Sequence, residues 1–253
     1  MAIIALMNQK GGIGKTTGAV NIAAGLARLG RKVLLIDMDP QAHATLSLGI
    51  SGELEKTVFE VLSEKITAAD CIIDRDGLAV IPSGLQLASA EMQFIGAPGR
   101  EIILRGALEP ITADFEYILI DCPPSIGVLT MNALAAADGV FVPVKTEYLS
   151  TRGIAQLIDT VDLIRQRVNK GLAITGVFGT FYDARRTLDK EIMTAVREIF
   201  GAAVFETVIR SNIAIAEAPG HGKTVFEYAP NSHGAEDFTA LCQEVISREG
   251  RKQ

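Results

Sequence analysis

The sequence predicts an α/β fold in which a mostly parallel, twisted sheet is flanked by helices on both faces. Strand-like apolar runs alternate along the chain with segments of helical apolar spacing, and this alternation favours a parallel sheet. The strand-like runs are almost continuous in Val, Ile and Leu, as is typical of strands buried on both faces. A glycine-rich stretch joins the first strand-like run to the first helical segment.

The elements follow from these patterns in chain order. Strands are predicted at residues 3–7, 33–36, 78–81, 117–120, 140–144, 173–178 and 204–209. Helices are predicted at residues 16–29, 57–62, 85–94, 100–108, 151–168, 188–200 and 235–248. The first helix shows the helical spacing in Val20, Ile22, Ala23, Leu26 and Leu29.

No repeat, low-complexity tract or linker interrupts the alternation, so residues 1–253 are expected to form a single domain. A short disordered tail is expected at residues 250–253. The chain is 48% apolar, which supplies an ample core for one large α/β domain.

The bulk composition also bears on location and cofactor class. The sequence has no run of 18 or more apolar residues and opens directly on a strand, so we expect a cytoplasmic protein without a membrane partner. Its cysteines, Cys71, Cys122 and Cys242, lie far apart and form no C-x-x-C pair. They therefore indicate neither a disulfide framework nor a zinc or iron–sulfur site.

The charge is uneven along the chain. The net charge is −6, which argues against a surface coated in positive charge for nucleic acid. Residues 1–150 carry 11 Lys and Arg against 17 Asp and Glu, whereas residues 151–253 carry 13 of each kind. Any DNA contact is thus expected to be a local patch on the second half of the chain.

The glycine-rich loop reads Lys10-Gly11-Gly12-Ile13-Gly14-Lys15-Thr16-Thr17. Its glycines allow backbone N–H groups to point at phosphates, and the following helix adds its positive dipole end. Lys15 is expected to reach the β- and γ-phosphates, and the Thr16 hydroxyl to ligate Mg²⁺. Gln9 stands where the plain rule has Gly, and Lys10 is a second lysine within the loop, so the loop is a deviant Walker A sequence. The chain is predicted to be a P-loop NTPase that binds a nucleoside triphosphate.

Two acidic motifs lie at the ends of predicted strands, where ligands bind in open α/β sheets. Asp37 and Asp39 follow the second strand, and Asp121 ends the strand at 117–120. Asp121 is predicted to hold Mg²⁺, as a Walker B aspartate does. Since Asp37 and Asp39 are two residues apart, one is expected to support the site while the other reaches the attacking water.

Together these motifs resemble the ParA/Soj family of partition ATPases, within the SIMIBI-like class that includes MinD and the nitrogenase iron protein. The resemblance extends over nearly the whole chain. It includes Asn8 to Thr17, Asp37 to Gln41, Asp121 to Ser125, Pro143-Val144 with Glu147-Tyr148, Tyr182 to Arg185, Glu217-Ala218-Pro219, and His221-Gly222-Lys223.

The resemblance implies roles for individual residues. Lys10 matches a signature lysine that reaches the partner's phosphates in a nucleotide-sandwich dimer, and Asp39 matches the aspartate that positions water. The predicted catalytic residues are Lys10, Lys15 and Asp39, and the predicted metal site comprises Thr16, Asp37 and Asp121. The predicted ATP-binding residues are Lys10, Gly11, Gly12, Gly14, Lys15, Thr16, Thr17, Arg210 and Asn212, the last as a base contact.

The chain also departs from the family pattern. Ser211 and Ala214 replace two arginines that usually precede the Glu-Ala-Pro segment, and Ala42-His43 replaces the usual Gly-Asn. Arginines near the first of these loops are implicated in non-specific DNA binding, so that activity or its location is put in question. The remaining candidates for DNA contact are Arg165, Arg167, Lys170, Arg185, Arg186, Lys190, Arg197 and Arg210.

The resemblance implies a slow ATPase that forms a homodimer with ATP and Mg²⁺, binds DNA without sequence preference and is stimulated by a ParB-like or other cargo adaptor. Its cargo is expected to be a plasmid or chromosome, with nucleoid association in the ATP state. A protein cargo such as carboxysomes or chemoreceptor clusters is the alternative.

A MinD-like membrane cycle is less consistent with the C-terminal helix, which lacks a basic amphipathic face. The cysteine arrangement argues against a nitrogenase-like reductase.

Overall fold

The computed structural model describes residues 1–94, 96, 98–146 and 151–250. Seven strands form one sheet in the order β3-β4-β2-β5-β1-β6-β7, and every neighbouring pair is parallel except β3 with β4. The strands are β1 Ala2–Leu6, β2 Val33–Asp37, β3 Ile73–Arg75, β4 Leu78–Ile81, β5 Tyr117–Asp121, β6 Gly139–Lys145 and β7 Ala173–Thr180.

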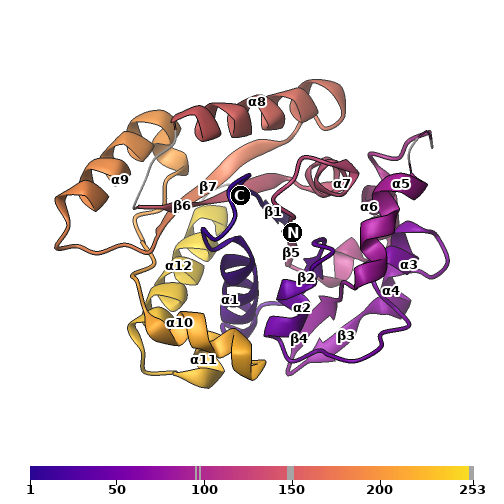
Figure 1. The fold of residues 1–253 in the computed structure, drawn as a ribbon, viewed down its shortest axis with the longest axis horizontal. Helices are drawn as coiled ribbons and strands as arrows, with labels where there is room; N and C mark the ends of the chain where they lie inside the picture. The colour runs from indigo at the N-terminus through magenta and orange to yellow at the C-terminus, as the bar shows by residue number, and fades with distance from the viewer. Residues whose placement is uncertain (95, 97, 147–150, 251–253) are drawn as a thin grey trace.

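Helices connect the strands and cover the sheet (Figure 1). The longer helices are α1 Lys15–Arg28, α7 Val128–Ala136, α8 Thr151–Arg167, α9 Thr187–Phe200 and α12 His233–Gly250. The short α-helices are α2 His43–Ser47, α3 Val58–Leu62, α4 Ala68–Cys71, α5 Ala90–Gln93, α6 Ile103–Leu108, α10 Ile213–Glu217 and α11 Val225–Tyr228. Four 3₁₀ turns complete the set: η1 Leu85–Ser89, η2 Glu109–Asp114, η3 Gly201–Ala203 and η4 Ala218–His221.

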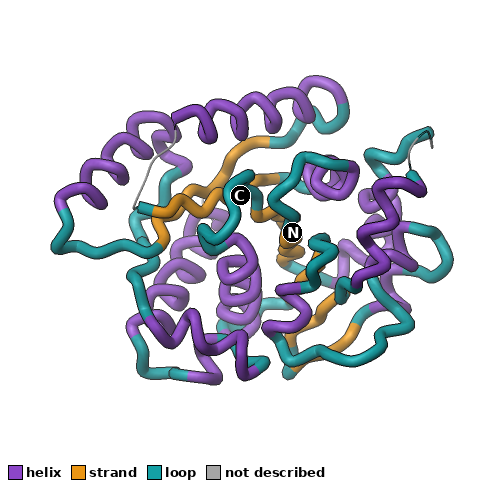
Figure 2. Tube along the Cα trace, viewed as in Figure 1, coloured by secondary structure: helices purple, strands orange, loops and turns teal. Residues whose placement is uncertain are grey.

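The core lies in two apolar clusters, one on each face of the sheet. Successive side chains of a strand point to opposite faces, so neighbouring residues of β1 belong to different clusters. Ile3 packs in the cluster beneath α3, α6, α7 and α8, and Ile4 packs in the cluster beneath α1 and α12. Figure 1 shows α8 on one side of β6 and β7, with α1 and α12 side by side on the other. The strands lie between these helical layers in Figure 2. The predicted mostly parallel sheet with helices on both faces is confirmed.

One predicted strand is wrong. The backbone of residues 204–209 is joined to β7 by an isolated bridge at Val204 and two hydrogen bonds, and the described residues form no continuous ladder there. The N–H groups of Glu206 and Thr207 instead donate to the two carboxylate oxygens of Glu244 on α12, at 2.9 and 3.0 Å. A side chain from the C-terminal helix thus takes the place of a strand ladder.

Other elements differ in kind or were not predicted. Residues 85–94 form η1 followed by α5 rather than one helix. The hairpin strand β3 is only three residues long, and the crossover helix α7 is apolar on nearly every side, so neither shows a usable period. The sequence predicts a disordered tail at residues 250–253, but the helix α12 extends to Gly250, and residues 251–253 lie outside the described residues.

Candidate nucleotide-binding site

The glycine-rich loop connects β1 to α1 at the carboxyl edge of the sheet. Gly12 and Gly14 have φ angles of +69° and +92°, a left-handed conformation that glycine adopts without the strain of a Cβ atom. The first turn of α1 contains no acidic residue, so nothing in that turn neutralises the positive end of the helix. The predicted phosphate-binding loop is therefore present, with the strand, turn and helix in the expected order.

Lys15 is the first residue of α1 and is buried, with 7% of its surface exposed. Its Nζ donates a hydrogen bond of 3.1 Å to the backbone oxygen of Lys10, which closes the loop on itself. Burial lowers the pKa of Lys15, while the nearby Asp121 opposes that effect. A buried cation at a helix N-terminus suits a phosphate ligand, whose negative oxygens accept charge-assisted hydrogen bonds from an ammonium group.

Asp37 ends β2 and is fully buried. Its carboxylate accepts hydrogen bonds from the N–H of Asp39 at 3.1 Å, and from the N–H and hydroxyl of Thr45 at 2.9 and 2.8 Å. Burial raises the pKa of Asp37 to about 6 despite these donors. Asp37 is thus held in place by α2, whereas among the described residues the Asp39 carboxylate accepts from the N–H of Gln41 alone, at 2.9 Å.

Asp121 ends β5 and is also fully buried. Neither of its carboxylate oxygens has a hydrogen-bond partner among the described residues. Burial raises the pKa of Asp121 well above its usual range, the charge of Asp37 adds to this, and the Thr16 hydroxyl nearby acts in the opposite direction.

These residues fit Mg²⁺. Two orphaned carboxylate oxygens beside a hydroxyl are hard oxygen donors, and Mg²⁺ usually keeps several waters and uses phosphate oxygens for the rest. No group of three or more His, Cys, Asp or Glu converges for a metal within the described part of the chain. A site of one hydroxyl and one or two carboxylates, completed by water and phosphate, needs no such group.

Lys10 lies on the exposed rim of the loop, in contrast to Lys15. Its backbone N–H donates to the Asn8 side chain at 3.2 Å, and the Asn8 amide donates to the backbone oxygen of Pro143 on β6 at 2.9 Å. The loop is therefore braced against the neighbouring strand. Glu147 and Tyr148, which belong to the same family motif, lie outside the described residues.

Asn212 and Arg210 both have partners within the chain. The Asn212 side-chain oxygen caps α10 by accepting from the N–H of Ala214 at 2.8 Å, which leaves its amide group to donate. The Arg210 guanidinium binds Asp237 through two nitrogens, at 2.9 and 2.6 Å, and Glu236 at 3.2 Å. Arg210 thus ties the segment before α10 to α12, and its predicted contacts with ATP and DNA remain predictions.

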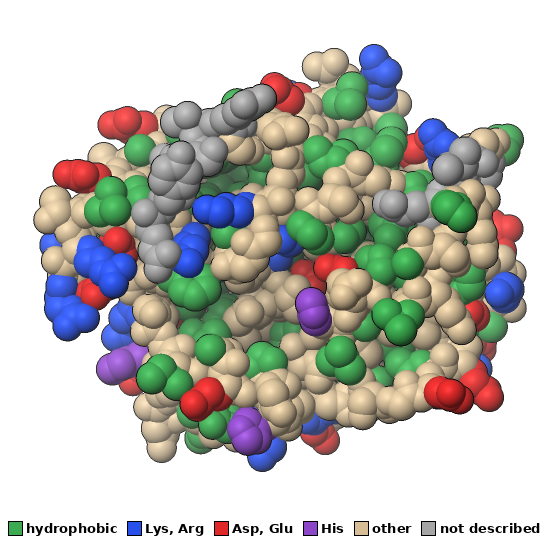
Figure 3. Space-filling model, in the orientation of Figure 1, with side chains coloured by type: hydrophobic (Ala, Val, Ile, Leu, Met, Phe, Trp, Pro, Cys, Tyr) green, Lys and Arg blue, Asp and Glu red, His purple; other side chains and the backbone are tan. Residues whose placement is uncertain are grey.

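The predicted DNA-contact residues spread over α8, α9 and the loops beside them. Figure 3 shows Lys and Arg side chains gathered at the left of the visible face, where the loop between β7 and α9 lies. In this loop the Arg185 side chain is 90% exposed and binds Asp183 at 2.8 Å, and Arg186 lies 3.8 Å from the same carboxylate. Arg165 and Arg197 are paired with Asp162 and Glu206.

Sequence reasoning missed two threonines that position the site. Thr45 holds Asp37, and its hydroxyl also accepts from the N–H of Ser83 at 2.9 Å. Thr180, at the end of β7, donates its hydroxyl to the backbone oxygen of Ile13 in the loop at 2.9 Å. The separation in sequence between Thr180 and Ile13 left no local signal of this contact.

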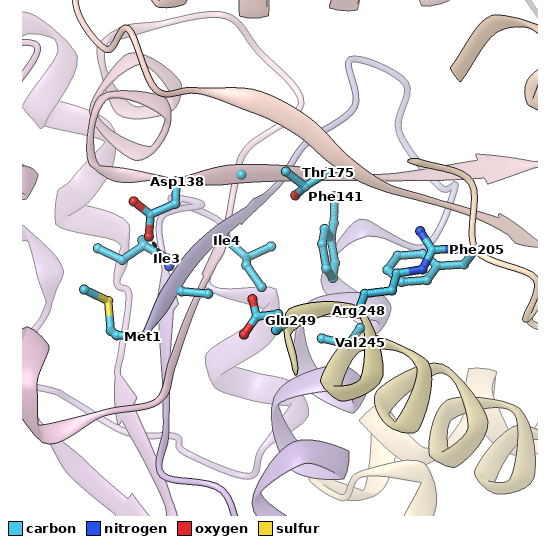
Figure 4. A pocket seen from close by; sticks show the side chains of 12 residues that line it. Met1, Ile3, Ile4, Asp138, Phe141, Thr175, Phe205, Val245, Arg248 and Glu249 are labelled. Carbon is cyan, nitrogen blue, oxygen red and sulfur yellow. Dashed lines mark hydrogen bonds between the residues drawn. The ribbon is translucent and has the colours of Figure 1, made fainter. Parts of the chain in front are cut away.

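A separate cavity of about 380 Å³ lies at the opposite edge of the sheet, near the start of β1 and the end of α12 (Figure 4). The N–H of Ile3 donates to Asp138 there at 2.9 Å, and the Arg248 guanidinium lies 4.1 Å from the centre of the Phe205 ring. Because the phosphate loop and the aspartates lie at the other edge, this cavity is not part of the nucleotide site.

The fold and the loop define a P-loop NTPase. A family model described as an AAA domain matches residues 1–174. The sporulation initiation inhibitor protein Soj of Bacillus subtilis is 44% identical over 248 residues, which cover 97% of this chain and 98% of Soj. The chromosome partitioning protein ParA of Myxococcus xanthus is 40% identical over 253 residues, covering 99% of this chain and 89% of ParA.

A crystal structure of cobyrinic acid a,c-diamide synthase from Mycobacterium smegmatis, with bound ADP and magnesium, is similar in fold. Its TM-score is 0.88 at 32% identity, and the match covers 100% of this chain and 97% of that one. The chain belongs to the ParA/Soj family of ATPases, and the resemblance drawn from its motifs is confirmed.

Proposed function

We propose that this protein is an ATP-driven switch that positions or segregates cargo. In this proposal ATP and Mg²⁺ join two copies into a dimer, and the dimer binds DNA of the nucleoid without sequence preference. A cargo-bound partner of the ParB type then stimulates slow hydrolysis and release. The observation that supports dimerisation most is the contrast between the two loop lysines, because Lys15 is buried toward the loop while Lys10 stands on its exposed rim.

We propose that the aspartates bind Mg²⁺ and position the water that hydrolyses ATP. When bound, Mg²⁺ would be held by Thr16 and Asp121, with Asp37 behind them, and would neutralise charge on the phosphates. Asp39 is 8% exposed, and its carboxylate is held less tightly than that of Asp37, so it can turn toward an attacking water. None of these residues is a strong base in an obvious pose, which favours slow turnover that a partner accelerates.

The proposed contact with DNA lies at the loop between β7 and α9. Arg185 and Arg186 are its exposed cations, and a dimer would present two such loops, so that weak phosphate contacts suffice. A protein cargo is the second candidate, since Ser211 and Ala214 are uncharged. Arg185, Arg197 and Arg210 are in addition all paired with carboxylates. A MinD-like membrane cycle has less support, because the apolar side chains of α12, such as Phe238 and Leu241, are buried.

No helix in the described ranges is both long and apolar enough to cross a membrane.

Binding to non-specific DNA with and without ATP, across a salt series, tests the proposal. We expect binding only with ATP, falling steeply as salt rises, and weakened by Arg185→Glu or Arg186→Glu. Arg31→Glu is a matched control, because Arg31 is a surface arginine paired with Glu116 far from this loop. Equal binding by ATP-free protein would refute the switch. No DNA binding at all would favour the protein-cargo alternative.

A further inference from the structure

A chain of hydrogen bonds, buried at its start and exposed at its end, connects the phosphate loop to the basic loop of residues 181–186. Its first member is Thr180, whose hydroxyl donates to the backbone oxygen of Ile13 at 2.9 Å. The same side chain packs against the next loop residue, since a Cβ atom placed on Gly14 would lie 3.5 Å from the Thr180 methyl group. A movement of the loop at Ile13 and Gly14 would therefore displace Thr180 at the end of β7.

The second member is Thr146, which is fully buried beside Thr180. Its N–H donates to the Thr180 backbone oxygen at 3.1 Å. Its hydroxyl lies 3.2 Å from that same oxygen and 3.0 Å from Oδ2 of Asp189. A hydroxyl has one proton to donate, so two acceptors compete for it, and a small shift of Thr180 changes the balance between them.

The third member is Asp189, in the first turn of α9, which is fully buried. Its Oδ2 also accepts from the N–H of Asp183 at 2.8 Å, while its Oδ1 has no partner among the described residues. Asp183 in turn binds the N–H, Nε and Nη2 of Arg185 at 3.0, 2.9 and 2.8 Å. The position of the exposed arginine thus depends on a buried carboxylate.

The segment between these members is strained. Phe181 has a φ angle of +57°, a left-handed conformation that a bulky side chain seldom adopts. Such a residue keeps that conformation only where its surroundings hold it. The neighbouring Tyr182 provides two of the restraints, because its N–H donates to Ile209 at 3.1 Å and its backbone oxygen accepts from Ser211 at 3.2 Å. A strained residue at 181, next to a hydroxyl proton that two acceptors share, is suited to a segment that switches between two arrangements.

We propose that Asp189 is a positioning residue that, through Thr146 and Thr180, couples occupancy of the phosphate loop to the arrangement of residues 182–188. The proposal rests on the proposed function for its biological use, in that DNA affinity would follow the nucleotide state through this route. Asp189 touches neither nucleotide nor DNA, and its effect is to set where Asp183 holds Arg185.

Hydrogen–deuterium exchange with and without a slowly hydrolysed ATP analogue and Mg²⁺ tests the coupling directly. In the wild type we expect the analogue to protect residues 8–17 and to change exchange in residues 182–188. Thr146→Val keeps the side-chain shape but removes the shared proton, so it should lose the change at 182–188 and keep the protection at 8–17. Thr146→Ser restores the hydroxyl and should restore the response.

Thr160→Val is the matched control, because Thr160 is another buried threonine whose hydroxyl donates to a backbone oxygen, that of Gln156, within α8. It should respond as the wild type does. Asp189→Ala gives a second test if Thr146→Val folds poorly, because it removes the oxygen that accepts from Thr146 and from the N–H of Asp183. It should lose the same response. A wild-type response at 182–188 in either variant, or none in the wild type when 8–17 is protected, would overturn the coupling.

The DNA measurement separates this inference from the proposed function. If both hold, the ratio of DNA affinities with ATP and with ADP should fall to near one in Thr146→Val. If exchange at 182–188 responds to nucleotide but wild-type DNA binding does not, the coupling stands and the DNA function fails.

Discussion

Asp37 and Asp121 are paired in register across the parallel strands β2 and β5, so two buried carboxylates lie side by side at the carboxyl edge of the sheet. Their surroundings differ. Asp37 accepts three hydrogen bonds, whereas the two oxygens of Asp121 have no partner in the described chain. One aspartate is fixed by its neighbours, while the oxygens of the other are without a partner in the described chain, which suits its proposed role as a magnesium ligand.

Asp121→Asn should change how stability depends on pH in the nucleotide-free protein. Burial holds the folded-state pKa of Asp121 above its unfolded value. The stability that its protonated form contributes is therefore present at low pH and lost as the pH rises through the folded pKa. The advantage of the variant over the wild type should grow as the pH rises above about 4, the ordinary pKa of an aspartate.

Urea unfolding of both proteins in EDTA across this range measures the difference. A stability difference that stays constant with pH would show that Asp121 does not titrate as its burial demands. The same variant should need more Mg²⁺ for nucleotide binding and turnover.

Lys15→Ala should abolish nucleotide binding, because it removes the buried cation that we propose to face the phosphates and whose Nζ donates to the backbone oxygen of Lys10. Titration calorimetry with ATP and Mg²⁺ measures the loss. Lys32→Ala, at an exposed lysine just before β2, is the control and should bind normally. Wild-type affinity in Lys15→Ala would contradict the phosphate-loop assignment.

Asp39→Ala should bind ATP but hydrolyse it about 10²-fold more slowly or worse, since it removes the group that positions water. Because Asp39 also accepts from the Gln41 N–H, a simple turn-capping role has to be separated from catalysis. Asp39→Asn keeps an oxygen for that hydrogen bond and should still turn over slowly. Phosphate release per folded molecule, with melting temperature alongside, distinguishes the two roles. Normal turnover in a less stable Asp39→Ala would indicate a turn cap.

Ala42→Gly should stabilise the protein by about 0.5–1 kcal/mol. Ala42 has a φ angle of +53°, a left-handed conformation that strains an alanine between Asp39 and the helix that supplies Thr45. Ala69→Gly, on an exposed turn of the right-handed helix α4, is the control and should destabilise by about 1 kcal/mol. Denaturant unfolding measures both changes. A destabilised Ala42→Gly would show that Ala42 makes contacts that outweigh its backbone strain.

The sequence was most informative where chemistry and local pattern coincide. The phosphate loop, the strand-end aspartates and the layered sheet could all be predicted, because each depends on a short motif or on a buried apolar run. The strand at 204–209 could not be corrected from sequence, since its N–H groups are taken by Glu244, a residue far along the chain. The order of the strands, and hence the pairing of Asp37 with Asp121, likewise follows only from tertiary packing.

The positioning residues were the least predictable part of the site. Thr45, Thr146, Thr180 and Asp189 act through hydrogen bonds between distant segments, and such residues have no motif of their own. Arg210 is predicted from its place in the family pattern to contact a ligand, and that contact remains a prediction, but its guanidinium also binds Asp237, which no motif indicated. Charge alone does not tell a binding arginine from one that ties two elements together.

Light scattering of Asp39→Ala with and without ATP and Mg²⁺ is the sharpest test of ATP-driven dimerisation, because the variant should hold ATP without consuming it. We expect a 27.0 kDa monomer that doubles in mass when ATP is added. Lys10→Ala, placed in the same background, should weaken the conversion while it still binds ATP. A protein that binds ATP and remains a monomer, or one that is dimeric without nucleotide, would refute the proposed switch.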